Sequence, residues 1–162
     1  MKRYVLGLAF TEANSVLMVQ KNRPAWQAGK LNFIGGKIDP DPDGYGDEIP
    51  VAAMVREFYE ETGIYTKQSD WKLIGSMGRA GFDNDGNEDG EDFEVVLFKA
   101  GPDKMFNYFF QMEDEEIILV PRSKFTVDRS LDQWYISNIR TIYEFAISKD
   151  CEDGAIIQIG YP

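Results

Sequence analysis

The sequence predicts one layered α+β domain that spans residues 1–162. The length of 162 residues suits a single domain with a sizeable core, and apolar and aromatic fractions of 43% and 14% are those of a globular chain. Short β-rich runs and two amphipathic helical stretches follow one another in mixed order. Neither an internal repeat nor a linker divides the chain, so we expect one domain.

The N-terminal part of the chain is expected to form strands. The runs 3–12 and 15–23 are rich in β-forming residues, and the short polar turn between them predicts a hairpin. A further short strand is expected at 31–34, just before a pair of glycines. The segment 37–48 is acidic and rich in Pro and Gly, which indicates a loop.

The first helix is expected at 50–62. Pro50 fits a first helical turn, and Gly63 is a natural helix stop. Apolar residues at helical spacing mark the side that we expect to be buried: Val51, Met54, Val55, Phe58 and Thr62.

The middle of the chain predicts more strands. They are expected at 71–78 and 93–100, around a polar loop, and at 116–121. The apolar run 104–110 is ambiguous, and strand is the better interpretation.

A second helix is expected near the C-terminus. Ser130 and Gln133 form a possible capping box, and apolar residues then recur at helical spacing as far as Ala146. The apolar run 155–162 predicts a final short strand.

The composition excludes several classes of function. A net charge of −11 and a pI near 4.4 argue against a nucleic-acid polymer or an anionic membrane as partner. Histidine is absent, so catalytic triads and metal sites that need imidazole are excluded. Cys151 is the only cysteine, which fits a reducing cytoplasm and excludes an internal disulfide. The N-terminal apolar run is too short for a signal peptide, and no window is long enough to span a bilayer.

The stretch REFYEETG, from Arg56 to Gly63, carries a costly arrangement of charge. Glu57, Glu60 and Glu61 fall at i, i+3 and i+4, so a helix places their carboxylates on one face. Two charges about 5 Å apart repel by roughly 3 kcal/mol at an effective dielectric of about 20, and a last helical turn disfavours anions. Such a face is usually just solvated, but clustered carboxylates are also what Mg²⁺ or Mn²⁺ requires. Because two local rules are broken together here, the composition and spacing alone predict a divalent cation site with a catalytic role.

Residues 36–64 resemble the Nudix box of the Nudix hydrolase superfamily. Glu48, seven residues and then REFYEETGI match the box, and the lead-in GKLNFIGGK is also similar to the family. Eleven residues separate Gly36 from Glu48, about six more than in the box, and loops absorb such length cheaply. The resemblance implies an α/β/α sandwich with a mixed β-sheet, and a metal-dependent hydrolase of phosphoanhydride bonds in small nucleotides.

The resemblance also implies roles for individual residues. Glu48 either holds a second ion or pairs with Arg56, which orients the carboxylates. The implied ligands of a Mg²⁺ ion, with Mn²⁺ as the alternative, are the Gly36 carbonyl and the carboxylates of Glu57, Glu60 and Glu61.

The general base is left open by the resemblance. The candidates within the box are Glu57 and Glu61, and those outside it are Glu113 and Glu116 of the MEDEEI cluster. The plainer interpretation of that cluster is a solvated acidic loop.

Several residues near the box are candidates for binding the substrate. Lys21 and Arg23 suit phosphate, Trp26 and Phe33 suit stacking on a base, and Asn32 suits a base edge. Each also has a plainer interpretation, as a surface cation, a core aromatic residue or a surface amide.

Three hypotheses of function follow. The leading one is an enzyme that acts on canonical or oxidised nucleoside triphosphates or a nucleotide sugar, with ADP-ribose and dinucleoside polyphosphates as further substrate classes, working as a monomer or homodimer. The second is a sensor of nucleotides or ADP-ribose-type ligands that binds without turnover. A third, an EF-hand at 85–96, is disfavoured because Val96 stands where a bidentate Glu is needed.

Overall fold

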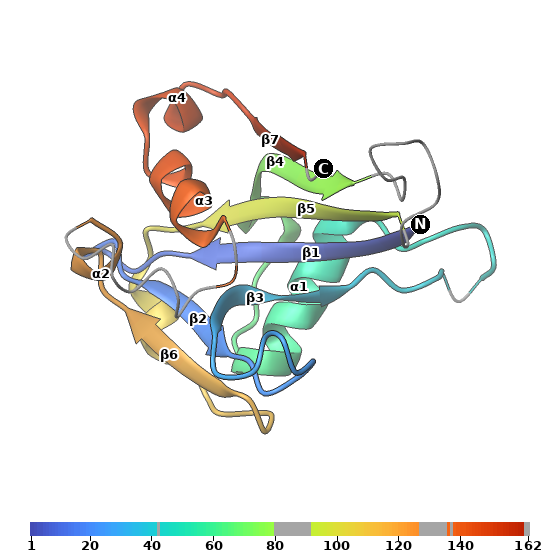
Figure 1. The fold of residues 1–162 in the computed structure, drawn as a ribbon, viewed down its shortest axis with the longest axis horizontal. Coiled ribbons are helices and arrows are strands. Elements are labelled where there is room, and N and C mark those ends of the chain that lie inside the picture. Colours follow the sequence, from blue (N-terminus) through green and yellow to red (C-terminus); the bar gives the residue numbers. More distant parts are fainter. Residues whose placement is uncertain (42, 80–91, 127–135, 137, 161–162) are drawn as a thin grey trace.

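The computed structural model describes residues 1–41, 43–79, 92–126, 136 and 138–160, and it places a β-sheet between layers of helix (Figure 1). The strands within these residues are β1 (Lys2–Ala9), β2 (Val16–Gln20), β3 (Leu31–Lys37), β4 (Lys72–Arg79), β5 (Phe93–Ala100), β6 (Glu116–Val120) and β7 (Ile157–Gly160). The α-helices are α1 (Pro50–Thr62), α2 (Ser123–Thr126), α3 (Ile139–Ala146) and α4 (Lys149–Glu152), with 3₁₀ turns at Gln68–Asp70 and Lys104–Asn107.

β1 lies at the centre of the sheet, whose strand order is β6-β2-β3-β1-β5-β4-β7. It pairs antiparallel with β3 and parallel with β5. In this register Val5 of β1 lies between Gly36 of β3 and Val96 of β5. The β2–β3, β2–β6 and β4–β5 pairs are antiparallel, whereas β4 and β7 are parallel. The sheet is therefore mixed, as predicted.

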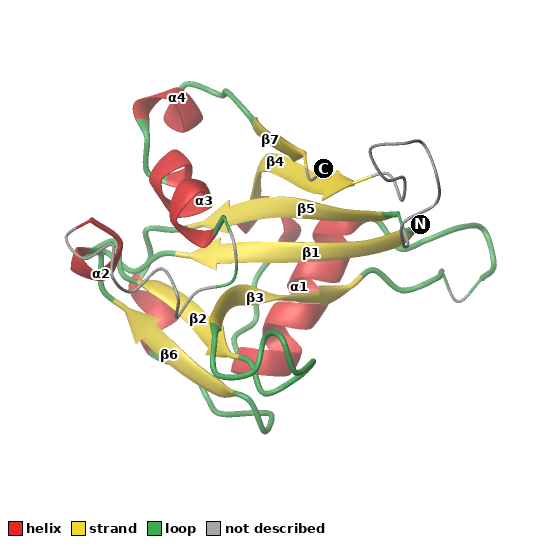
Figure 2. Cartoon of the chain, viewed as in Figure 1, coloured by secondary structure: helices red, strands yellow, loops and turns green. Residues whose placement is uncertain are grey.

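The two faces of the sheet are covered by different helices: α1 packs on one and α3 on the other (Figure 2). Val5 of β1 packs in the same cluster as Met54 and Phe58 of α1. Leu6, the next residue, packs instead with Ile142 of α3. Because successive strand residues point to opposite faces, β1 contributes to both halves of the core. This layering confirms the predicted α/β/α sandwich.

α1 begins and ends where the sequence predicts. Pro50 lies in its first turn, and Gly63 ends it in the left-handed conformation, with φ of 71° and its N–H bonded to the Tyr59 carbonyl. Met54 and Phe58 of the predicted stripe are fully buried. Glu61 is buried on the same side of the helix, whereas Glu60 is exposed.

The predicted hairpin of 3–12 and 15–23 is wrong. Both runs form strands, but these strands are not neighbours in the sheet. β3 lies between β1 and β2, which are joined only near their turn by a bridge between Phe10 and Val16. β1 carries buried apolar side chains on both faces, so it takes a central position with β3 and β5 as neighbours. The turn signal is local, whereas the pairing is decided by burial across the whole sheet.

The predicted strand at 104–110 is also wrong. The side chain of Asp103 accepts a hydrogen bond from the Met105 N–H and begins a 3₁₀ turn at Lys104–Asn107. Phe106 is buried, but Tyr108 and Phe110 are exposed, so this apolar run does not form a core strand.

The predicted C-terminal helix includes α3, whose first residue is Ile139. Ser130, Gln133 and their neighbours lie outside the described residues. The Ile136 N–H bonds to the Leu31 carbonyl, and Asn138 has φ of 69°, so α3 starts at Ile139.

The other predicted strands are confirmed, although their bounds differ by a few residues. The predicted strands at 31–34, 71–78, 93–100 and 116–121 correspond to β3, β4, β5 and β6, and the final one to β7. The segment 85–90, the start of the disfavoured EF-hand, lies outside the described residues. No helix within the described residues combines the length and apolar character required to cross a bilayer.

Candidate active site

The carboxylate face of α1, formed by Glu57, Glu60 and Glu61, is graded in burial. Glu61 is 9% exposed, whereas the side chain of Glu60 is 47% exposed. Glu57 lies between these limits, with its side chain 15% exposed. Helical spacing brings the three residues to one side, where Glu61 is buried, Glu57 is partly buried and Glu60 is exposed.

Arg56 is the common partner of the acidic residues around this face. Its Nη1 donates to Glu57 Oε1 at 2.7 Å and to Glu60 Oε2 at 3.4 Å. Its Nη2 donates to a carboxylate oxygen of Glu48 and, at 2.9 Å, to the Lys37 carbonyl. The hydrogen bond to Glu48 makes the largest contribution to raising the pKa of Arg56. Arg56 therefore offsets part of the repulsion among these carboxylates.

Glu57 lies directly over the backbone of β3. A Cβ atom built at Gly36 would come within 2.3 Å of Glu57 Oε2, so any side chain there would displace the carboxylate. Burial raises the pKa of Glu57, and the hydrogen bond from Arg56 opposes the shift. Gly36 thus permits a close approach between a strand and an acidic side chain.

Glu61 has a buried oxygen without a partner. Its Oε2 is the only buried side-chain polar atom of the described residues that makes no hydrogen bond. Burial raises the pKa of Glu61 to about 8; the charge of Lys21 opposes this shift, and Glu113 adds to it. An ionised carboxylate in this position needs a positive charge close by.

The arrangement fits a divalent cation in the chemistry of its donors. Among the described residues no three acidic side chains converge as a complete metal site, because Arg56 holds Glu57 and Glu60. The unpartnered Glu61 oxygen and the contact between Glu57 and Gly36 nevertheless supply hard oxygens where a cation would relieve the charge. The residues that would hold it are Gly36, Glu57, Glu60 and Glu61. Glu48, the alternative holder of a second ion, is bonded instead to Arg56 and to the Asp39 N–H.

The inserted loop before α1 is a closed hairpin. Pro40 and Asp47 form an antiparallel bridge, and Asp39 donates its N–H to Glu48 Oε1 at 3.0 Å. The hairpin projects from the end of β3, and Tyr45 near its tip is 92% exposed (Figure 1). The two ends of the hairpin therefore meet at Asp39 and Glu48, next to Arg56. The hydrogen bonds that Glu48 accepts from Arg56 and Asp39 outweigh burial and lower its pKa.

The acidic turn, residues 111–117, approaches the carboxylate face from a distant part of the sequence. The Gln111 side chain forms hydrogen bonds across the turn. Its Oε1 accepts from the Ile117 N–H at 2.9 Å, and its Nε2 donates to the Glu113 and Glu115 carbonyls. Glu113 is exposed, and its charge acts on Glu61. Glu116 is exposed at the start of β6, where it pairs with Gln20.

Glu115 is a buried residue that the sequence analysis missed. It is 8% exposed, and both of its carboxylate oxygens are used, by Lys21 Nζ at 2.6 Å and by the Asn22 N–H at 2.6 Å. A sequence pattern of consecutive acids gives no sign of this, because the partners lie 94 and 93 positions away.

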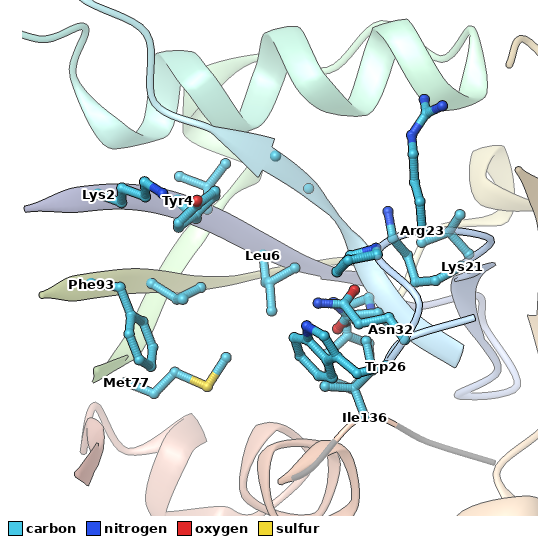
Figure 3. Close-up of a pocket in the computed structure, with 18 residues that line it drawn as sticks. Lys2, Tyr4, Leu6, Lys21, Arg23, Trp26, Asn32, Met77, Phe93 and Ile136 are labelled. Atoms are coloured by element: carbon cyan, nitrogen blue, oxygen red, sulfur yellow. Dashed lines mark hydrogen bonds between the residues drawn. The ribbon is translucent and has the colours of Figure 1, made fainter. Parts of the chain in front are cut away.

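A cavity of about 770 Å³ is lined by residues of the sheet and of the segments beside it, with Gly36 among them (Figure 3). Trp26, Asn32 and Ile136 gather at one end, and Leu6 lies between them and the opposite end. The side chains labelled at the opposite end are Lys2, Tyr4, Met77 and Phe93. These come from three strands, β1, β4 and β5, that are far apart in the sequence, so no local pattern could have identified them.

The predicted binding residues all line this cavity, in different ways. Trp26 is 62% exposed, whereas Phe33 is a core residue. Asn32 Oδ1 accepts from the Phe33 N–H at 2.9 Å, which leaves its amide nitrogen for other partners. Lys21 is paired with Glu115. Arg23 is exposed, and its guanidinium points away from Trp26 (Figure 3).

Gly36 joins the two halves of the site. It lines the cavity, and it also lies under the Glu57 carboxylate.

A family model described as the NUDIX domain matches residues 1–137. The chain belongs to the NUDIX family. This membership confirms the resemblance of residues 36–64 to the Nudix box.

Solved structures with the same Nudix fold include three that are similar over most of both chains. The MutT protein of Bacillus halodurans has a TM-score of 0.63 and 18% identity, and the match covers 98% of this chain and 87% of that chain. The MutT protein of Methanosarcina mazei Go1 has a TM-score of 0.61 and 21% identity, with 94% and 95% covered. The NUDIX domain of Shewanella oneidensis NrtR, complexed with ADP ribose, has a TM-score of 0.62 and 18% identity, with 89% and 84% covered.

The comparisons bear on the fold and the family. At identities of 18% to 21%, the likeness to these structures shows the fold alone. Among the curated proteins none matches the chain.

Proposed function

We propose that this Nudix protein hydrolyses a phosphoanhydride bond in a small nucleotide, with the help of a divalent cation. The observation that carries the proposal is the position of Gly36, which borders a ligand-sized cavity on one side and the carboxylate face on the other. Membership of the family supports the reaction class, and the cavity supports a small ligand.

The cation in this proposal is Mg²⁺, with Mn²⁺ as the alternative. It would be held by Glu57, Glu60, Glu61 and the Gly36 carbonyl. When bound there, a divalent cation neutralises phosphate charge and activates water. The unpartnered oxygen of Glu61 supports this assignment, because it is a buried acceptor that lacks a donor.

The chain's own residues orient the carboxylates and provide candidates for proton transfer. Arg56 fixes Glu57 and Glu48 by direct hydrogen bonds. Glu113 is the favoured general base among the residues outside the box, because its charge acts on Glu61 from an exposed turn. Glu57, Glu61 and Glu116 remain the other candidates for this role.

The cavity residues hold the nucleotide in this account. Trp26 offers an exposed aromatic face for stacking, Asn32 an amide for a base edge, and Arg23 an exposed cation for phosphate. Phe33 forms part of the cavity wall rather than a free stacking surface. The NUDIX domain of NrtR binds ADP ribose in its solved structure, which supports a ligand with linked phosphates for this chain too.

Location and assembly belong to the same proposal. A reducing cytoplasm suits the single cysteine, Cys151, which is buried and free. We expect the protein to act on a small molecule, not on a nucleic-acid polymer or a membrane, as a monomer or homodimer.

A nucleotide panel tests the proposal. The wild type is incubated with nucleoside triphosphates, oxidised nucleotides, nucleotide sugars, ADP-ribose and dinucleoside polyphosphates, each with Mg²⁺ and with Mn²⁺, and the products are identified by mass. Cleavage that requires the cation and is lost in Glu57→Gln supports the proposal. Tight binding of a nucleotide with no product would favour the sensor hypothesis.

A further inference from the structure

Glu115 differs from the other acids of its turn in being buried, with a close partner for each of its two carboxylate oxygens. Its Oε1 lies 2.6 Å from Lys21 Nζ, and its Oε2 accepts from the Asn22 N–H at 2.6 Å. Lys21 and Asn22 directly follow β2, so this one carboxylate ties the acidic turn to the end of a sheet strand. The side chains of Lys21 and Glu115 are 20% and 9% exposed, so water screens the pair weakly.

The other acids of the turn lack this anchorage. Asp114 is largely exposed and lies at 3.5 Å from Asn22 Nδ2 and 4.0 Å from an Arg23 nitrogen, which are marginal contacts. Glu113 is exposed, and its neighbour Met112 lies beside the end of α1, since a Cβ atom built at Gly63 would come within 3.3 Å of Met112 Sδ. The pairing of β6 with β2 holds one end of the turn, and Glu115 is the acidic side chain that ties the rest of it to the end of β2.

The same contact occupies Lys21. Its ammonium group is paired with Glu115, although its side chain lines the cavity. Arg23, two residues later, has a side chain that is 75% exposed, and it remains the more accessible cation at this edge of the cavity. One carboxylate therefore fixes two things at once: the turn that carries Glu113, and the first residue of the loop that carries Arg23 and Trp26.

We propose that Glu115 is a positioning residue, which clamps the acidic turn to Lys21 and Asn22 and thereby holds Glu113 within reach of the carboxylate face. Lys21 serves this clamp and is not the cation that binds phosphate. The inference rests on the proposed function, since it assigns Glu115 an effect on turnover that passes through Glu113.

Glu115→Gln tests the clamp most directly. An amide side chain has one acceptor oxygen, whereas the clamp uses both oxygens of the carboxylate. A glutamine oxygen can serve either Lys21 or the Asn22 N–H, and its NH₂ group opposes the remaining donor. We expect kcat to fall by about 10- to 100-fold, since small displacements of catalytic groups have effects of this size, while KM changes little. Glu115→Asp, with a shorter side chain that reaches only one partner, gives the same result if the first variant folds poorly.

A double-mutant cycle with Glu113→Gln distinguishes positioning from general stability. If Glu115 acts through Glu113, the double variant has the kcat of Glu113→Gln alone. If the two losses multiply, or if Glu115→Gln keeps full kcat, the proposal is overturned. The matched control is Asp153→Asn, which breaks an exposed ion pair of similar length, 2.7 Å from Lys149, and should leave kcat unchanged.

Amide hydrogen exchange provides a readout that does not need activity. The N–H groups of Asn22 and Ile117 are protected by the clamp and the turn, so both should exchange faster in Glu115→Gln than in the wild type and in Asp153→Asn. Unchanged protection would overturn the clamp. If the wild type cleaves no nucleotide, the proposed function fails, and faster exchange at these two amides still supports the clamp.

Discussion

The carboxylate face of α1 and the acidic turn are both rich in glutamate, yet their side chains are placed by different forces. On the helix, Glu57, Glu60 and Glu61 share a face because helical spacing puts them there. On the turn, Glu113 is exposed near the face and Glu115 is buried against a lysine 94 positions away. A run of acids in a helix therefore has a geometry that the sequence dictates, whereas a run of acids in a turn takes its geometry from distant partners.

The two regions also differ in whether the oxygens of their buried glutamates have hydrogen-bond donors. The buried glutamate of the turn, Glu115, has both oxygens bonded to donors. The buried glutamate of the helix, Glu61, has an oxygen with no donor. A satisfied buried carboxylate is a structural part, and an unsatisfied one is a candidate for function. The predictions below test this distinction.

The largest effect is expected from Glu61→Gln. We predict a fall in turnover of about 10³-fold, because the variant removes a charge from the face that would hold the cation. Steady-state kinetics on the substrate found in the nucleotide panel measures it. The matched control is Glu152→Gln, on an exposed helix far from the face in sequence, which should retain full activity. Equal rates in wild type and Glu61→Gln would mean that this buried carboxylate has no part in the reaction.

The second effect is a loss of stability in Arg56→Met. This variant removes the partner of Glu48, Glu57 and Glu60 at once. We expect the free energy of unfolding to fall by about 2–4 kcal/mol, because it leaves partly buried carboxylates without a counter-charge. Urea denaturation measures the change. A divalent cation should restore part of the loss, and a variant as stable as the wild type would contradict the role of Arg56.

The third effect is a dependence of stability on pH in the cation-free protein. Burial raises the pKa of Glu61 from its ordinary value of 4.5 to about 8, so the folded state binds the proton more tightly than the unfolded state. This contribution is complete below pH 4.5 and is lost as the pH rises through about 8. We expect the unfolding free energy to fall by a few kcal/mol over that range.

Denaturant titrations at several pH values test this, with Glu61→Gln as the comparison. The variant cannot ionise at this position, so its stability should vary less with pH over the same range. Identical pH profiles for the two proteins would show that Glu61 does not titrate as a buried group.

How much of the site the sequence predicts depends on the range of the interactions. Pro50, Gly63 and the helical spacing fix α1 and its carboxylate face locally, so both were predictable. The partners of Glu115 and the central position of β1 depend on contacts between distant segments, which no local pattern contains. The cavity is the extreme case, since residues from Lys2 to Ile136 line it.

The smallest effect is expected from shortening the inserted hairpin. Replacing residues 41–46 by an Asn-Gly turn keeps the bridge between Pro40 and Asp47, and it keeps the Asp39–Glu48 contacts at the base. Stability should change by less than about 1 kcal/mol, because loop length has a small entropic effect. Thermal unfolding and the turnover rate check this; a large loss of turnover would give the insertion a role in the site.

The most direct test of the account is a crystal soaked in Mn²⁺ and measured at the manganese absorption edge. The account predicts an anomalous peak between the carboxylates of Glu57 and Glu61 and the carbonyl of Gly36. A crystal that shows no peak there, with both carboxylates unchanged beside Arg56 and the acidic turn, would contradict it.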